Sequence, residues 1–417
     1  MAVPAAAGTR PQDLSLDALV PWMAERLEAS TVELTEIRRH AEGFSWGTYT
    51  FTVVWTDAAG TTHRDGMALR REPEAGLLPP YDTRAQYVIH EALLEHSTIP
   101  MPALRWLETG HDVLGMPFYV MDRVTGHVPV PWGPNDPIAF PTEEARVDLG
   151  HQFVDLLAEL HHLDPADLGM TVPSTDPVEA ARHEIAVWRD RYEANLIRPI
   201  PILEQAFAWL DREEHIAVSG KLVPTHGDYR IGNFMIDDDR RINALFDWEL
   251  AHASDPIEDL AWSGMRLFRG KSPRWSHLLE YEPMMARYTE RTGTPVTPEA
   301  IRFWTILCYV KASANYVRGS GTFEAGGSSD LRLAAMGTSS PSCCASCRPN
   351  SARRPDAERT RAHPRRHLPG AEPGDRPEDR RSLRPRAGDL RRGAHREPRR
   401  SRHLAARLPL RVDPRLP

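Results

Sequence analysis

The stretch that decides the fold runs from Thr225 to Glu249 and reads THGDYRIGNFMIDDDRRINALFDWE. Two apolar runs, NFMIDD and INALFDW, flank the polar turn DDDRR, a pattern typical of a β-hairpin. Asn233 opens the first run and Asp247 closes the second. Because a hairpin brings the outer ends of its two strands together, we expect Asn233 and Asp247 to converge on one point.

An amide oxygen beside a carboxylate makes a hard, oxygen-only set of ligands, which suits Mg²⁺. Asp228 precedes Asn233 by five residues, near enough to this point to accept a proton from an incoming hydroxyl. Arg230 lies between them and can stabilise charge on a phosphoryl group in transfer. These residue types indicate phosphoryl transfer, in which catalysis rests on positioning and electrostatics.

The composition places the chain among soluble globular proteins, with 41% hydrophobic and 26% charged residues. It has no apolar run long enough to cross a membrane, and its N-terminus lacks the apolar core of a signal peptide. Four cysteines in 417 residues do not make a disulfide framework, so we expect a reducing, cytoplasmic location.

The composition changes at Gly337. From there to Pro417 the chain holds 21 Arg, no Lys, 9 acidic residues and no aromatic residue. Such a segment cannot bury enough apolar surface to offset its chain entropy, so we predict a disordered tail. Its charge is +12, and since the whole chain carries −7, the remainder carries −19.

Three interpretations of this tail compete. It could be a basic arm for nucleic acid or acidic membrane, but no aromatic residues are present to stack on bases. Cys343, Cys344 and Cys347 could bind a metal, but no second ligand pair accompanies them. The absence of Lys and the abrupt change favour a GC-rich gene read in a shifted frame. We therefore expect no nucleic-acid or membrane partner, and on this interpretation the tail replaces the last helices.

Before the tail, strand patterns precede helical ones. Helical spacing between Leu16 and Leu27 is interrupted by Pro21, which should kink or restart a helix. Strand-like runs follow in EGFSWGTYTFTVVWTDAAG, MALRR and VLGMPFYVMDRV, with a helix expected over 85–96. From about Thr142 helices dominate, and they resume after the hairpin over 257–335.

The motif H-G-D-x-R-x-x-N followed by F-D-W-E resembles the catalytic and metal-binding loops of the aminoglycoside phosphotransferase and choline kinase family, over about Leu14 to Ala335. The resemblance implies an α+β, two-lobed protein-kinase-like fold with a small antiparallel-sheet N-lobe and a larger, mainly helical C-lobe. The implied boundaries are 1–122 for the nucleotide-binding lobe, 123–336 for the catalytic and substrate lobe, and 337–417 for the tail. It also implies ATP and Mg²⁺, with the metal on Asn233 and Asp247, and with catalytic roles for His226, Asp228 and Arg230.

The N-lobe carries two further resemblances. GFSWGTY resembles the family's phosphate-covering loop, in which backbone N–H groups approach the phosphates, here at Gly43, Ser45 and Gly47. Trp46 departs from the small or polar residue usual there, and alone the segment also fits an ordinary hairpin turn. LGMPFYVMDRVTGHVP resembles the hinge that binds adenine, and its candidate residues are Met121, Asp122 and Val124. A buried strand and a turn would equally explain that segment.

Kinases usually hold the nucleotide phosphates with a strand lysine, but the only lysines here are Lys221, Lys271 and Lys311, outside the small lobe. Arg70 in MALRR is the best substitute, because Arg can bind phosphate bidentately. The implied carboxylate partner is Glu91, with Gln86 as the other candidate residue. Alternatively, Arg70 is a solvated surface cation.

Two smaller features fit the resemblance. Asp259, in DPIEDLAW, would brace the catalytic loop through backbone hydrogen bonds, or would simply be an acidic residue at a helix start. His161 and His162 end an amphipathic helix, and we expect one to pack in the core and the other to cap the helix's carbonyl end.

The leading hypothesis is an ATP-dependent kinase of a small-molecule hydroxyl. The missing small-lobe lysine and Trp46 motivate the alternative, a pseudokinase or nucleotide-binding module without turnover. The charge of −19 before the tail would suit a cationic, aminoglycoside-like acceptor. MALRR and LGMPFYVMDRV resemble instead the branch associated with acyl-CoA dehydrogenases, which favours a hydroxyacyl-CoA-like acceptor. The oligomeric state is not readable from the sequence.

Overall fold

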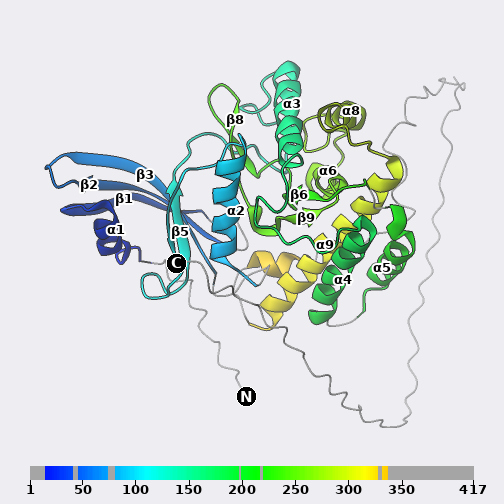
Figure 1. Cartoon of the computed structure of the whole chain (residues 1–417), viewed down its shortest axis with the longest axis horizontal. Coiled ribbons are helices and arrows are strands. Elements are labelled where there is room, and N and C mark those ends of the chain that lie inside the picture. Colours follow the sequence, from blue (N-terminus) through cyan, green and yellow to red (C-terminus); the bar gives the residue numbers. More distant parts are fainter. Residues whose placement is uncertain are drawn as a thin grey trace, which may run out of the picture. The chain divides into compact units, whose positions relative to one another are not determined.

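The computed structural model describes residues 15–40, 46–73, 80–196, 199–216, 219–326 and 331–336, and Figure 1 labels most of their helices and strands. The expectations for Gly43 and Ser45, for the cysteines of the tail, and for the tail itself, residues 337–417, lie outside the described residues.

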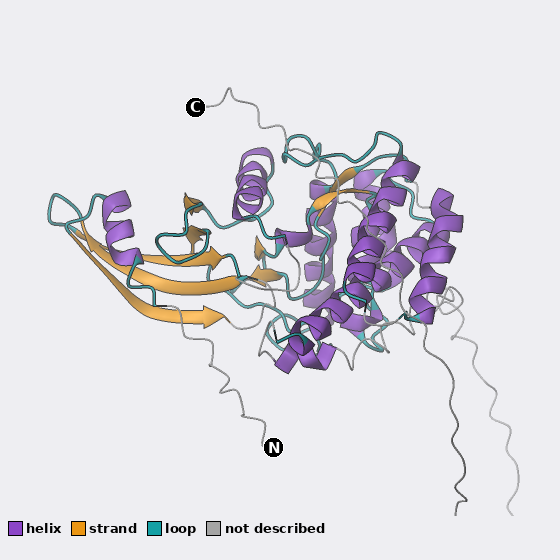
Figure 2. Ribbon diagram, turned by 90° about the horizontal axis from the view of Figure 1, so that it is seen from below, coloured by secondary structure: helices purple, strands orange, loops and turns teal. Residues whose placement is uncertain are grey.

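An antiparallel five-stranded sheet in the order β1-β2-β3-β5-β4 forms the first lobe. Figure 2 shows its long strands grouped together, with the short helix α1 lying against them. The elements of this lobe are α1 (Leu19–Leu27), β1 (Thr31–His40), β2 (Gly47–Thr56), β3 (Thr62–Arg71), α2 (Thr83–His96), β4 (Leu104–Glu108) and β5 (Phe118–Asp122).

The core of this lobe forms where one face of the sheet meets α1. Alternate residues of β2, among them Phe51 and Val53, point to this face and are fully buried with Leu19 and Met23 of the helix. Pro21 lies in the first turn of α1, where its missing N–H costs nothing, so the helix starts at Leu19 without a kink.

Strand β1 was not predicted from the sequence. Its sequence TVELTEIRRH carries four charged residues, and it lies at the edge of the sheet, paired with β2 and largely exposed. Charged side chains on an edge strand discourage pairing with other chains. Apolar alternation covers only Val32 and Leu34 before the register shifts between Thr35 and Arg38, which leaves a weak strand signal.

Helices make up most of the second lobe. Helices α4, α5 and α6 pack on the long helix α9, as Figure 1 shows, around buried residues such as Phe303, Trp304 and Leu307. Within the described ranges, no helix is both long and apolar enough to cross a membrane. The elements are α3 (Glu143–Leu160), α4 (Pro177–Ala194), α5 (Pro201–Glu213), η1 (Glu214–Ile216), β6 (Val223–Thr225), β7 (Phe234–Ile236), β8 (Ile242–Leu245), η2 (Trp248–Leu250), β9 (His252–Ser254), α6 (Ile257–Ser263), α7 (Arg266–Arg269), α8 (Tyr281–Thr292) and α9 (Pro298–Glu324).

The predicted hairpin is confirmed. Strands β7 and β8 pair antiparallel with Phe234 opposite Leu245, and Asp237 closes the turn by accepting the backbone N–H groups of Asp239 and Arg241. A second ladder, β6 with β9, pairs Thr225 with His252. The catalytic-loop candidate, residues 226–233, therefore joins two short antiparallel ladders.

The chain leaving β5 reaches this hairpin directly. The backbone N–H of His127 donates to the carbonyl of Ile236 at 2.8 Å, and the N–H of Ile236 donates back at 2.9 Å. A Cβ at Gly126 would lie 2.3 Å from that Ile236 carbonyl oxygen, so this close approach requires glycine.

Candidate active site

The loop from His226 to Asn233 is held by one buried carboxylate. Asp259 Oδ2 accepts the backbone N–H of His226 at 2.8 Å, and its Oδ1 accepts that of Gly227 at 2.9 Å. Asp259 also lies in the first turn of α6, where the helix dipole favours negative charge. The predicted bracing of the loop is thus confirmed, and the helix-start position accompanies it.

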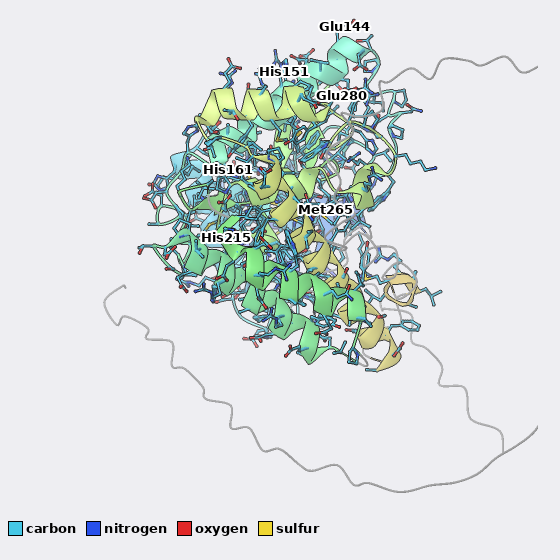
Figure 3. All side chains as sticks on the ribbon, turned by 90° about the vertical axis from the view of Figure 1, so that its right-hand side faces the viewer. Glu144, His151, His161, His215, Met265 and Glu280 are labelled. Atoms are coloured by element: carbon cyan, nitrogen blue, oxygen red, sulfur yellow. The ribbon has the colours of Figure 1, made fainter. Side chains whose placement is uncertain are left out.

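A buried histidine orients Asp259 in turn. His161 Nε2 lies 3.2 Å from Asp259 Oδ2, and His161 Nδ1 lies 2.6 Å from the Tyr288 hydroxyl. Burial lowers the pKa of His161, so we assign a neutral ring that donates from Nε2 to Asp259 and accepts from Tyr288. His161 is labelled among the helices in Figure 3. His162 Nδ1 lies 2.6 Å from the Ala158 carbonyl, so the predicted division between packing and capping is confirmed.

His226 is fully buried and uses both ring nitrogens inside the protein. Nε2 donates to the Phe246 carbonyl at 2.7 Å, and Nδ1 accepts the backbone N–H of Asp228 at 3.2 Å. The sequence grouped His226 with the catalytic residues, but a ring enclosed in this way has no nitrogen left for a substrate. We therefore correct its role to a positioning residue that ties the loop to the residue before Asp247.

The carboxylate of Asp228 receives three hydrogen bonds. Its Oδ1 accepts from Trp262 Nε1 at 2.6 Å and from Arg230 Nε at 2.9 Å, and its Oδ2 accepts from Asn233 Nδ2 at 2.6 Å. A carboxylate offers about four acceptor positions, so these donors leave one, on Oδ2. The side chain is 18% exposed, and this geometry suits a fixed base that accepts one hydroxyl proton.

Asn233 and Asp247 lie at the same end of the hairpin, as the spacing predicted. The N–H of Phe246 donates to the Asn233 carbonyl at 2.8 Å, so Asn233 just before β7 lies beside the segment just after β8 that carries Asp247. Asn233 Nδ2 also donates to the Asp228 carbonyl at 2.8 Å, so both its bonds turn the amide oxygen away from Asp228. Asp247 takes the rare left-handed conformation, with φ 61° and ψ 55°. An amide oxygen and a carboxylate at one hairpin end fit the ligand preference of Mg²⁺.

Arg70 on β3 reaches this site from the other lobe. Its Nη1 donates to Asp247 Oδ1 at 2.8 Å, and the residue is only 8% exposed, so it is not a solvated surface cation. Burial disfavours the charged carboxylate, but the Arg70 guanidinium outweighs it and holds the pKa of Asp247 below its usual range. Asp247 is therefore ionised at neutral pH.

The predicted partner of Arg70 was wrong. Glu91 is exposed on α2, and neither an ion pair with Glu91 nor a hydrogen bond with Gln86 reaches Arg70 within the described part of the chain. The buried face of α2 includes His90 and Leu93, and Glu91 is rotated about 100° away from His90 around the helix. The helix therefore presents a histidine rather than a carboxylate to the sheet.

Trp46 packs beside Arg70. The Arg70 Cζ lies 5.6 Å from the Trp46 ring centroid, and Tyr81 meets that ring edge-on at 5.8 Å. Arg70 Nε is buried without a hydrogen-bond partner. A buried donor without a partner is costly, so Nε is available to an incoming acceptor such as a phosphate oxygen.

The hinge candidates lie at the end of β5. Met121 is buried opposite Ala68. The backbone N–H of Asp122 donates to the Ala103 carbonyl, and its carboxylate pairs with Arg105 at 2.6 Å. The Asp122 N–H is thus used within the sheet. Val124 follows, partly buried, and Gly47 opens β2 opposite Arg71. Nucleotide contacts at these positions stay predictions.

Trp262 was missed from the sequence, although DPIEDLAW was singled out for Asp259. The two residues are three apart on α6 and so share a helix face. Asp259 holds the loop backbone while Trp262 donates to the Asp228 side chain. Once Asp259 is assigned to the loop, the three-residue spacing predicts that Trp262 faces the same loop. That spacing could have identified Trp262 from the sequence.

Trp262→Phe tests this role. The variant keeps a ring against Phe268 but removes the N–H donated to Asp228 Oδ1. We expect kcat to fall about tenfold with the KM for ATP unchanged, because a less oriented base affects the chemical step. Initial-rate kinetics measure both constants. If instead the KM rises and kcat stays unchanged, Trp262 contributes to binding rather than to the chemical step.

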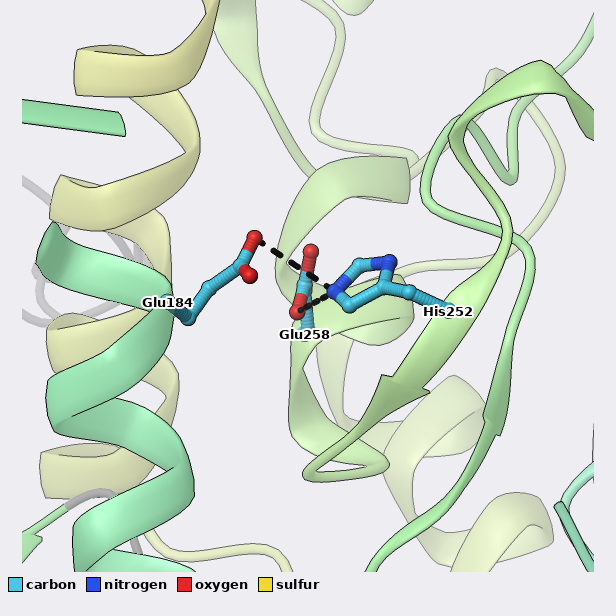
Figure 4. Close-up of side chains that lie close together, drawn as sticks. All are labelled: Glu184, His252 and Glu258. Atoms are coloured by element: carbon cyan, nitrogen blue, oxygen red, sulfur yellow. Dashed lines mark ion pairs between the residues drawn. The ribbon is translucent and has the colours of Figure 1, made fainter. Parts of the chain in front are cut away.

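A partly buried ion cluster contacts α6 through Glu258 (Figure 4). His252 Nε2 lies 3.2 Å from Glu258 Oε2 and 3.4 Å from Glu184 Oε1. These three side chains could together hold a metal ion, but the Lys311 ammonium pairs with both carboxylates and supplies the cation. Glu258 immediately precedes Asp259, so the cluster anchors the helix turn that braces the loop.

Stability should depend on the charge of His252. Although burial disfavours the imidazolium, Glu184 and Glu258 raise the pKa of His252 to about 9 from 6.5. Because the folded pKa is the higher one, this stabilisation is complete below pH 6.5 and is lost as the pH rises through 9. The side chain is 28% exposed, so solvent reduces the effect.

We therefore expect the Tm to fall between about pH 7.5 and 9.5, and to fall less in His252→Gln. Asp255, whose pKa burial raises to about 7, completes most of its change below this window. Thermal denaturation followed by circular dichroism gives both curves. Parallel curves for wild type and variant would show that His252 is not charged in the fold.

The model of the phosphotransferase enzyme family matches residues 37–289, more than half of the chain, and the chain belongs to that family. Its fold is therefore the two-lobed, kinase-like one that the sequence predicted.

Among proteins of known name, the chain is similar to acyl-CoA dehydrogenase family member 11 from Rattus norvegicus, at 27% identity over 57% of this chain and 29% of the relative. The same protein from Gallus gallus is 26% identical over 61% of this chain and 35% of the relative. The chain thus spans about a third of the length of these relatives.

Solved structures show the same fold. A Ralstonia eutropha protein assigned to the aminoglycoside phosphotransferases has a TM-score of 0.61 at 20% identity, covering 81% of this chain and 98% of that one. A thermostable mutant of aminoglycoside phosphotransferase APH(4)-Ia, solved with ADP and hygromycin B, has a TM-score of 0.51 at 14% identity, covering 79% and 98%.

Proposed function

We propose that the protein is a small-molecule kinase that moves the γ-phosphoryl group of ATP to an alcohol. The observation that carries this proposal is the Asp228 carboxylate, which three donors fix beside the hairpin end bearing Asn233 and Asp247. This arrangement places a candidate base beside candidate metal ligands, and phosphoryl transfer needs both groups next to the reacting phosphate.

In this proposal Asn233 and Asp247 hold Mg²⁺, which when bound neutralises phosphate charge. Asp228 orients the acceptor hydroxyl and takes its proton as the alcohol oxygen bonds to the γ-phosphorus and the bond to the ADP oxygen breaks. Arg230 stabilises charge on the transferring group. Nucleotide contacts come from Arg70 and from the backbone of Gly43, Ser45, Gly47, Met121, Asp122 and Val124.

The two candidate acceptor classes have separate support. A neighbour in fold binds hygromycin B, which favours an aminoglycoside-like acceptor. Relatives that contain a matching segment are acyl-CoA dehydrogenase family members, which favours a hydroxyacyl-CoA-like acceptor.

We place the nucleotide lobe at residues 1–122, the catalytic and substrate lobe at 123–336, and the protein in the cytoplasm.

The Arg70–Asp247 ion pair favours a second candidate function. A cation 2.8 Å from the metal carboxylate already neutralises it, and a chain that kept this pair would bind nucleotide without turnover. In the kinase, Arg70 must instead share its donors between Asp247 and a phosphate, which its unpartnered Nε allows.

Phosphate transfer to a panel of acceptors separates the two functions. Aminoglycosides and hydroxyacyl-CoA compounds are incubated with ATP and Mg²⁺, and phosphorylated products are detected by mass spectrometry. The kinase proposal expects one product that wild type forms and Asp228→Asn does not. ATP binding without any phosphorylated product would support the nucleotide-binding module.

A further inference from the structure

Three aromatic side chains contact one another in a row between the protein surface and Asp228, the proposed base. Trp132 is 63% exposed, and its ring centroid lies 5.9 Å from that of Phe268 on α7. Phe268 lies 5.9 Å from Trp262 on α6, whose Nε1 donates to Asp228 Oδ1 at 2.6 Å. We refer to Trp132, Phe268 and Trp262 as the aromatic wall. No role assigned above uses Trp132 or Phe268.

The loop that carries Trp132 is held in place by hydrogen bonds. The carboxylate of Asp136, 3% exposed, accepts from His127 Nε2 at 2.7 Å and from the backbone N–H groups of Val130, Ile138 and Ala139 at 3.0, 3.0 and 3.1 Å. Pro131 also packs on the catalytic loop, since a Cβ at Gly232 would lie 2.9 Å from Pro131 Cβ. The exposure of Trp132 is thus built into an ordered loop beside the site.

The charges around the wall oppose a cationic ligand. The Arg230 Cζ lies 4.8 Å above the Phe268 ring, and Arg230 pairs with the negative charge of Asp228. The segment 266–275 around Phe268 holds four further cations and no acidic residue: Arg266, Arg269, Lys271 and Arg274, of which Arg274 pairs with Glu143 on α3. The chain before the tail is acidic as a whole, so this run of positive charge is a local feature of the segment around Phe268.

We propose that the aromatic wall is the acceptor subsite and takes an alcohol with a flat apolar body and no positive charge. Phe268 and Trp262 are buried, and Trp132 is exposed together with Val130 and Ile138 on one loop. An exposed apolar patch beside a base marks a ligand site, and the Trp132 ring can stack on a flat apolar group. The proposal rests on the phosphotransferase function and narrows it, because it excludes polycationic acceptors from this surface.

Two matched probes test the subsite on the full chain. Phenethyl alcohol and ethanolamine share a hydroxyethyl group and differ in ending with a phenyl ring or an ammonium. Ligand-observed NMR measures the binding of each to wild type, Trp132→Ala, Trp132→Phe and Ile37→Ala. Ile37, 50% exposed on β1, is the matched control for loss of an exposed apolar side chain.

We expect wild type to prefer phenethyl alcohol over ethanolamine. Trp132→Ala should weaken phenethyl alcohol about tenfold, the loss of one stacked ring, while Trp132→Phe and Ile37→Ala bind like wild type. Equal binding by wild type and Trp132→Ala, or a preference for ethanolamine, would overturn the subsite. A separate titration of ATP distinguishes the two proposals, because failure of wild type to bind ATP would overturn the phosphotransferase function and leave the probe result standing.

Discussion

Asp228→Asn is expected to lower kcat for phosphoryl transfer about a thousandfold while the Kd for ATP changes little. The amide cannot take the hydroxyl proton. It also fits the three donors poorly: if its oxygen stays with Trp262 and Arg230, its NH₂ group faces the Asn233 NH₂ 2.6 Å away. The lost base affects the chemical step and not ATP binding, while the clash also reaches Asn233, so the Kd for ATP is measured beside kcat.

The measurement is the initial rate of ADP release with a saturating acceptor, alongside a calorimetric Kd for ATP. Asp238→Asn is the matched control, since Asp238 is exposed in the hairpin turn ten residues away and should keep the wild-type rate. An Asp228→Asn enzyme as fast as wild type would reject Asp228 as the base.

Asp247→Ala is expected to abolish the Mg²⁺-dependent part of ATP binding. The substitution removes the one carboxylate at the proposed metal site and leaves the Asn233 amide oxygen, a weak ligand alone. It also leaves the nearly buried Arg70 guanidinium without its ion pair, which should cost about 1–3 kcal/mol of stability because the Asp247 side of the pair is partly exposed.

Two variants separate these effects. Arg70→Met removes the same ion pair but keeps the metal carboxylate, so it should lose stability and retain a response to Mg²⁺. Thermal denaturation confirms that each variant is folded before titration. If Asp247→Ala binds ATP with an undiminished dependence on Mg²⁺, the metal site lies elsewhere.

The parts of the site that are local in sequence could be predicted. The residues from His226 to Asp247 lie on one loop and one hairpin, so turn residues and strand pattern determine which side chains meet. The hairpin and the placing of Asn233 and Asp247 at one of its ends followed from short spacings, and the bracing by Asp259 followed from the family resemblance of DPIEDLAW. The role of His226 did not, because spacing does not reveal that its ring is enclosed.

Contacts between distant segments could not be predicted. Arg70 and Asp247 are 177 residues apart, and their pairing depends on how the sheet lobe meets the hairpin. The choice of Glu91 rested on family spacing, whereas the buried positions of α2, His90, Ala92 and Leu93, leave Glu91 exposed. Strands β1, β4 and β9 were not predicted: β1 is an exposed edge strand with little apolar alternation, and β4 and β9 have only five and three residues.

Calorimetric titration of ATP into the full-length protein, with and without Mg²⁺, tests the central claim most directly. The account predicts binding that depends on Mg²⁺, because Asn233 and Asp247 hold the ion and Arg70 turns its free donor to a phosphate. No binding, or the same affinity with and without Mg²⁺, would contradict it.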